Sequence, residues 1–180
     1  MDATGQPCIE VTGAADPALR RWLQVEVGRA VGAAHDAAGV PARVARMSVR
    51  IVDDAQMCVL HERHSGVRGT TDVLTFVGGE ALHAAPGPSA RGEGARDRLG
   101  AAPGIEIDAA ICADEAARRC ADFGHGVREE LLLYAVHALM HAVGFDDATP
   151  DGHARMHAEE DRLLQGLGHG ALFAGRGRAA

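Results

Sequence analysis

The sequence predicts an α+β fold in which helices pack against one small, mostly mixed β-sheet. Two patterns lead to this prediction. Short segments in which apolar and polar residues alternate, as in strands, are interspersed with longer segments of helical periodicity. One segment, residues 129–147, is so apolar that its helix must be buried on most sides. With 180 residues, 47% of them hydrophobic, the chain is expected to form a single domain over residues 1–180.

The individual elements follow from these periods and from local start and stop signals. Asp16-Pro17 and Thr149-Pro150 each supply an N-cap and a first-turn proline, so helices are expected to begin there. The predicted strands are residues 7–12, 45–52, 73–76 and 105–112; the predicted helices run from Pro17 for about 20 residues and over residues 54–64, 114–120, 126–143 and 150–167.

Two segments are expected to lie outside the packed core. Residues 79–104 are rich in Gly and Pro and have few large apolar side chains, which predicts a surface insertion or a disordered loop. The glycine-rich residues 168–180 are predicted to form a frayed tail.

Composition limits the class of protein. The net charge of −7 argues against a protein that coats nucleic acid through bulk charge, but it is compatible with a local groove lined by Arg. No apolar run reaches the 18 or so residues of a membrane helix, and no signal peptide is recognised, so we expect a cytoplasmic protein. The four cysteines show no C-x2-C spacing, which makes a cysteine-based zinc site improbable.

A candidate metal site lies on the central helix. His137 and His141 are spaced i, i+4, so both imidazoles share one helical face. Gly144 suits a left-handed helix end, after which the chain can turn back and deliver Asp147. Two histidines and one carboxylate with an open fourth position form the arrangement of a catalytic zinc.

Other residues compete for these roles. Position 138 is Ala, so the glutamate that acts as general base in zinc proteases is absent. His153 and His157 also have the i, i+4 spacing. Because Pro150 directs the preceding chain away from the site, we expect both on a partly exposed face of the last helix, with His153 nearer to the metal.

Two polar sets beside predicted strands are candidate substrate contacts. Alternation in residues 45–52 places Arg46 and Arg50 opposite the inward Met47, Val49 and Ile51; a solvated face is the ordinary interpretation and a phosphate-binding groove the alternative. Thr71 and Asp72 precede the strand at 73–76, where they could orient a neighbouring site or simply bond loop amides.

Taken together, Thr71-Asp72-Val73-Leu74-Thr75-Phe76 and, about 60 residues later, His137-Ala-Leu-Met-His141-Ala-Val-Gly144-Phe-Asp146-Asp147 resemble the motifs of the YbeY family of bacterial rRNA maturation factors. The resemblance extends over residues 5–167. It implies a zinc-dependent endoribonuclease specific for single strands, which acts on rRNA at the small ribosomal subunit, in 16S rRNA 3′-end maturation and ribosome quality control. It implies neither a DNA nor a membrane partner.

The sequence departs from the family pattern H-G-x-L-H-x2-G-Y-D-H at the last ligand, where Asp147 replaces His, and at Ala138, where Gly is usual. The Arg that the family places six residues before the Thr of T-D-V-L-S-F is Ser65 here; Arg63 and Arg68 flank it and are candidates to replace it.

The resulting hypothesis is metal-assisted phosphodiester hydrolysis. Arg63 or Arg68 would neutralise charge on the phosphate, and Asp146 is a candidate general base that could instead cap or support the site. A zinc peptidase and a non-catalytic ribosome-associated factor with a structural metal are the alternatives.

Overall fold

A computed structural model describes residues 6–37, 43–79 and 104–173. The elements follow in the order β1 (Cys8–Gly13), α1 (Pro17–Ala37), β2 (Arg43–Val52), α2 (Asp54–Ser65), β3 (Val73–Gly78), β4 (Gly104–Cys112), α3 (Ala113–Phe123), α4 (Val127–Ala142) and α5 (Pro150–Leu167). The α+β class is confirmed, and every predicted element is present with ends shifted by at most a few residues. The insertion predicted at 79–104 lies, apart from its ends, outside the described residues.

The sheet is mixed, with strand order β1-β2-β4-β3. β1, β2 and β4 are parallel, whereas β3 pairs antiparallel with β4. Met47, Val49 and Ile51 are buried, as their alternation predicts. Their side chains therefore assign one face of the sheet to the main core.

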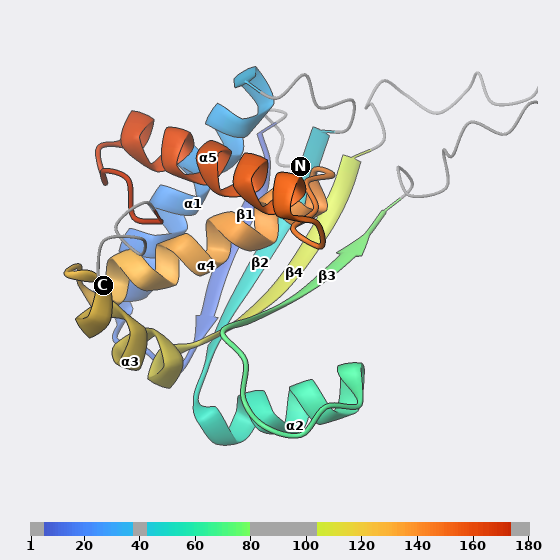
Figure 1. Cartoon of the computed structure of the whole chain (residues 1–180), viewed down its shortest axis with the longest axis vertical. Coiled ribbons are helices and arrows are strands. Elements are labelled where there is room, and N and C mark those ends of the chain that lie inside the picture. Colours follow the sequence, from blue (N-terminus) through green and yellow to red (C-terminus); the bar gives the residue numbers. More distant parts are fainter. Residues whose placement is uncertain (1–5, 38–42, 80–103, 174–180) are drawn as a thin grey trace, which may run out of the picture.

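Helices α1 and α4 pack on this face, and α5 packs against both of them; Figure 1 shows α4 and α5 lying side by side. The prediction of a central buried helix is confirmed, because residues 130–136 of α4 are all buried. Helix α2 lies on the other face, where its Leu60 lines a hollow together with Ser48 and Arg50. We call the face of the sheet that carries Met47, Val49 and Ile51 the metal-side face, and the opposite face the α2-side face. None of the described helices is both long enough and apolar enough to cross a membrane.

The prediction of a frayed tail is wrong for residues 168–173. Leu172 belongs to the main core. His169 Nε2 lies 3.0 Å from Glu26 Oε2 on α1, and the Phe173 amide donates to Asp161 Oδ1 on α5 at 2.8 Å. Acceptors on two distant elements thus hold a segment whose glycine content suggested fraying. Residues 174–180 lie outside the described part of the chain.

Candidate metal centre

Helix α4 brings two imidazoles together at its C-terminal end. His137 and His141 are one turn apart, their ring centroids are 4.6 Å apart, and their Nε2 atoms are separated by 3.1 Å. Two nitrogens that bind one zinc at about 2.0–2.1 Å in a tetrahedral site are roughly 3.3 Å apart. The spacing of the two Nε2 atoms therefore suits a shared ion.

The turn after α4 delivers the carboxylate. Gly144 has φ +101°, a left-handed conformation that side chains disfavour, and there the chain reverses. Asp147 consequently reaches the histidines, with its Oδ2 4.0 Å from His137 Nε2 and its Oδ1 3.8 Å from His141 Nε2. All three side chains are half-buried, so the group is open to solvent on one side.

Hydrogen bonds on the opposite side of each ring fix the tautomers. His141 Nδ1 lies 3.2 Å from the carbonyl oxygen of Phe145, which can only accept, so Nδ1 carries the proton. His137 Nδ1 lies 2.8 Å from Glu160 Oε1 and donates in the same way. In the neutral rings both Nε2 atoms then present lone pairs to each other, an arrangement that favours a cation between them. The donor set fits zinc.

Glu160 also sets the proton affinity of the first ligand. Burial lowers the pKa of His137, but the hydrogen bond and negative charge of Glu160 outweigh this, and the pKa is raised overall. Asp72 and Asp147 contribute further negative charge to the rise. Zinc and protons would therefore compete for the same electron-rich ring.

Comparison with known proteins places the chain in a family. The family model described as Endoribonuclease YbeY matches residues 16–168, which contain α1 to α5 and all three candidate ligands. The chain belongs to the YbeY family.

Similar proteins share the family's name. Endoribonuclease YbeY of Thermobifida fusca is 36% identical over 123 residues, covering 68% of this chain and 72% of the relative. The Beutenbergia cavernae protein of the same name is 37% identical over 120 residues, covering 67% and 73%. The solution structure of TM1509 from Thermotoga maritima matches with a TM-score of 0.50 and 17% identity over 88% of this chain and 91% of that one. This last likeness concerns the fold alone.

Of the two later histidines of this YbeY-family chain, His153 is exposed as predicted, but the predictions that His157 is partly exposed and that His153 is the nearer to the metal are wrong. His153 is exposed, but His157 is buried, with its Nδ1 2.5 Å from Glu160 Oε2. Of the two, His157 is therefore the one linked to the candidate metal centre, through Glu160. The reason is helical phase, because His157 follows the buried Met156 on α5 and turns inward with it. Burial lowers the pKa of His157, and its hydrogen bond to Glu160 offsets this only in part.

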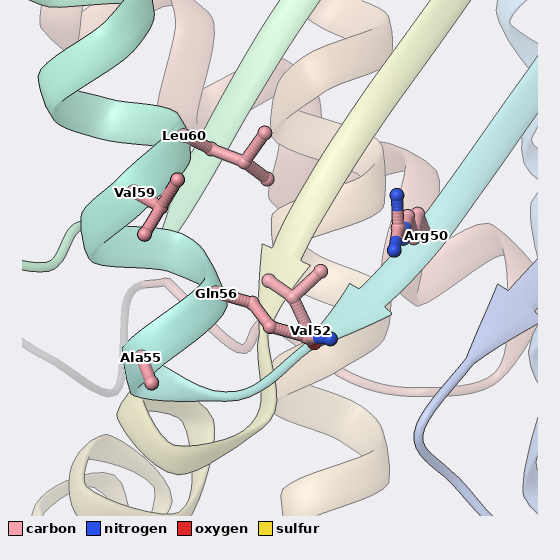
Figure 2. A pocket seen from close by; sticks show the side chains of 6 residues that line it. All are labelled: Arg50, Val52, Ala55, Gln56, Val59 and Leu60. Atoms are coloured by element: carbon pink, nitrogen blue, oxygen red, sulfur yellow. The ribbon is translucent and has the colours of Figure 1, made fainter.

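The outward arginines of β2 differ from each other. Arg46 lies 3.1 Å from Glu106 and 3.2 Å from Asp108, so acids of β4 already balance its charge. Arg50 has no ion pair with any residue in the described ranges, and it lines the hollow between α2 and the sheet. Figure 2 shows Arg50 and Val52 on β2 across this hollow from Val59 and Leu60 on α2.

The proposed catalytic residues are not joined to the histidines. Arg63 is exposed on α2, and Arg68 is 90% exposed and lies 3.1 Å from Glu62. No hydrogen bond or ion pair within the described part of the chain connects either arginine to His137, His141 or Asp147. Asp146 adjoins the third candidate ligand, and its Oδ1 accepts from the Ala148 amide at 3.1 Å. At least one oxygen of Asp146 thus stabilises the turn.

Asp72 makes the loop contacts that its motif predicts, and its orienting role at the site stays a prediction. Its Oδ1 accepts from the Val73 amide at 2.9 Å and from Thr71 Oγ1 at 3.1 Å, which is the loop-stabilising role. Its charge also raises the pKa of His137, so the carboxylate lies within electrostatic reach of the metal centre. The substrate contacts predicted for Thr71 and Asp72 stay predictions.

Sequence reasoning missed Glu160. This carboxylate is completely buried, although Glu is rarely buried without partners. A signal was present: Glu160 lies four residues after Met156 and four before Leu164, and both of these are buried on α5. A Glu in phase with an apolar stripe indicates a buried partner, here two imidazoles.

Proposed function

We propose that this chain is a metal-dependent endoribonuclease that cleaves single-stranded RNA and holds one zinc ion through His137, His141 and Asp147. The observation that carries the proposal is the meeting of two Nε2 lone pairs and one carboxylate at a half-buried opening. Membership of a family named for endoribonuclease activity supports RNA as the substrate. Within the proposal the RNA is rRNA, bound at the small ribosomal subunit in the cytoplasm, and the process is 16S rRNA 3′-end maturation and ribosome quality control.

Within the proposal, Asp147, Glu160 and Asp146 have different roles. When bound, zinc supplies a water of pKa near 7 and polarises a phosphoryl oxygen. Asp147 is anionic, so it leaves less positive charge at the site than a third neutral His would. Glu160 orients His137, and because both of its oxygens already accept hydrogen bonds it is not available as the general base. Asp146, at the opening, remains the candidate for that role.

Arginines near the substrate path would neutralise phosphate charge. Arg63 and Arg50 are exposed, and neither forms an ion pair with a described residue. Arg68 would have to leave Glu62, an exposed pair whose rupture costs about 0–1 kcal/mol. These residues are proposed as RNA contacts, with Arg63 or Arg68 closest to the scissile phosphate.

The two alternatives make different predictions. A peptidase would need a base beside the ion, and position 138 offers only a buried Ala. A non-catalytic factor would keep its metal and bind RNA without cutting it; Ser65, at the position where the family has Arg, is the feature that supports this alternative.

One experiment separates the three functions. Purified protein is incubated with a labelled single-stranded RNA, with the same RNA as a duplex, and with casein, each before and after chelation and zinc restoration. We expect zinc-dependent cutting of the single strand alone. Cleavage of casein would establish the peptidase, whereas RNA binding without cleavage at any zinc concentration would establish the non-catalytic factor. The His141→Ala variant is the control for contaminating nuclease.

A further inference from the structure

A continuous series of contacts, with the buried Glu160 and His157 at its middle, runs from the candidate metal centre to Phe173, the last described residue. Glu160 accepts from His137 Nδ1 at 2.8 Å and from His157 Nδ1 at 2.5 Å, using a different oxygen for each. The ring of His157 lies parallel to that of Phe173, with centroids 3.4 Å apart and planes inclined by 2°. We call residues 168–173 the C-terminal clasp.

His157 completes the environment that Glu160 needs. A fully buried carboxylate is costly unless hydrogen bonds replace its hydration. His137 supplies one donor, and His157 supplies another to the second oxygen. Two donors on two oxygens also fix the plane of the carboxylate. Without His157, one oxygen of Glu160 would lose its hydrogen-bond donor, the carboxylate plane would no longer be fixed, and the hydrogen bond from His137 Nδ1 would weaken.

The clasp fixes His157 in turn. Phe173 covers one face of the imidazole, and its own amide donates to Asp161 Oδ1 at 2.8 Å. Leu172 is buried in the main core, and His169 lies 3.0 Å from Glu26 on α1. The aromatic ring is therefore held at the end of a segment that is tied to two helices.

The same residues do not form a second zinc site. His137, His157 and Glu160 cluster closely enough to be considered as ligands. However, the nitrogen–oxygen distances of 2.8 and 2.5 Å are hydrogen-bond lengths. Ligand atoms that share one zinc at about 2.0–2.1 Å are separated by roughly 3.3 Å. The cluster is therefore a hydrogen-bonded support for the metal centre.

We propose that His157 and Phe173 are positioning residues for the metal centre, which act through Glu160 to hold His137 with its Nε2 directed at the ion. The inference rests on the proposed zinc site and adds to it a dependence on the C-terminal clasp. Neither residue belongs to the ligand group His137, His141 and Asp147.

The test measures zinc affinity by competition with a chromophoric chelator, together with the visible spectrum of the cobalt-substituted protein. We expect His157→Ala to weaken zinc binding about 10-fold, the lower end of the effect of removing a partner of a metal ligand. Phe173→Ala should weaken it severalfold, and both should alter the cobalt bands. His157→Gln, which can still donate to Glu160, should recover part of the affinity, as should Phe173→Tyr, which keeps the stacked ring.

His153→Ala is the matched control. It removes an imidazole one turn earlier on α5, whose ring also contacts Phe173, with centroids 5.7 Å apart, but has no hydrogen bond to Glu160. We expect less than a twofold change and an unaltered spectrum. If His157→Ala does not fold, Phe173→Ala and His157→Gln carry the measurement.

Failure of this inference is distinguishable from failure of the proposed function. If the unmodified protein binds one zinc that His141→Ala abolishes, but His157→Ala and Phe173→Ala retain full affinity and the same cobalt spectrum, the positioning role is overturned alone. If the unmodified protein binds no zinc, or His141→Ala leaves binding unchanged, the metal site itself is overturned and the positioning role with it.

Discussion

Polar side chains are buried and bonded to one another on the metal-side face, in the helices packed there, but are exposed to solvent on the α2-side face. On the metal-side face, His137, Glu160 and His157 are linked one to the next, and Glu160 is fully buried. On the α2-side face, Arg46 is paired with acids, while Arg50 on the same strand has no ion pair with a described residue. A buried polar group is costly unless it is hydrogen-bonded to another group of the protein, whereas water can solvate an exposed one. Function on the first face should depend on geometry, and on the second on charge.

The largest contrast is expected for the metal ligands. His141→Ala removes an Nε2 and should reduce zinc binding to background in elemental analysis after dialysis. Arg50→Ala, on the α2-side face, should retain about one zinc per chain. Full zinc occupancy in a His137→Ala/His141→Ala double variant would show that the metal binds elsewhere.

The second-largest effect is expected from a substitution at Gly152, which lets α5 lie close to the turn that carries Asp147. A Cβ on Gly152 would lie 2.3 Å from the Asp146 carbonyl oxygen and 2.9 Å from Thr149 Oγ1. Gly152→Ala must therefore displace the turn that carries Asp147. We expect a loss of about 1–3 kcal/mol in the free energy of unfolding, as for other overpacked sites, and weaker zinc binding.

Gly166→Ala is the control for this substitution. It lies on the same helix with no atom of another segment within 4 Å of its Cβ, and Ala there should stabilise the helix by up to about 1 kcal/mol. Chemical denaturation of both variants, with and without zinc, checks the difference. Equal stabilities for the two variants would mean that the turn adjusts without cost.

On the α2-side face and around it, the arginines that form no ion pair with a described residue should contribute most to RNA affinity. Arg50→Ala and Arg63→Ala should each weaken binding of a single-stranded RNA and reduce the salt slope by about 0.7 for each phosphate that the variant no longer neutralises. Arg46→Ala should have a smaller effect because Glu106 and Asp108 already balance its charge. Binding isotherms at several salt concentrations measure the slopes, and equal slopes for all three variants would reject these contacts.

The smallest expected effect is on the stability of the protein at low pH, through Asp54 at the start of α2. The hydrogen bonds that Arg118 donates to Asp54 lower the pKa of this carboxyl from 3.8 to about 2. A depressed pKa contributes stability above about pH 4, and this contribution is lost as the pH falls through about 2. Asp54→Asn should therefore slightly lower the melting temperature at pH 7, with the difference vanishing near pH 2. Glu62→Gln, which removes an exposed pair with Arg68, should change little at any pH.

Local patterns in the sequence were sufficient for the elements and for part of the site. Asp16-Pro17 and Thr149-Pro150 mark the starts of α1 and α5, where the Asp16 and Thr149 side chains accept amide hydrogen bonds. Alternation in β2 placed Met47, Val49 and Ile51 inward. Spacing alone brought His137 and His141 together, because one helical turn separates them. These predictions hold because each depends on bonds and angles within a few residues.

Contacts between distant segments decided the rest. Glu160 meets His137 across 23 positions of the chain, and Glu26 meets His169 across 143, so no local period reveals either pair. Because α4 packs against α5, His157, and not His153, is the histidine linked to the candidate metal centre. Leu172 packs in the main core, although the glycines of its segment predicted fraying. The sequence by itself determined which side chains share a helix face or a strand face. Only the tertiary structure decided which of them are buried together, because the cost of desolvation arises only once the elements pack.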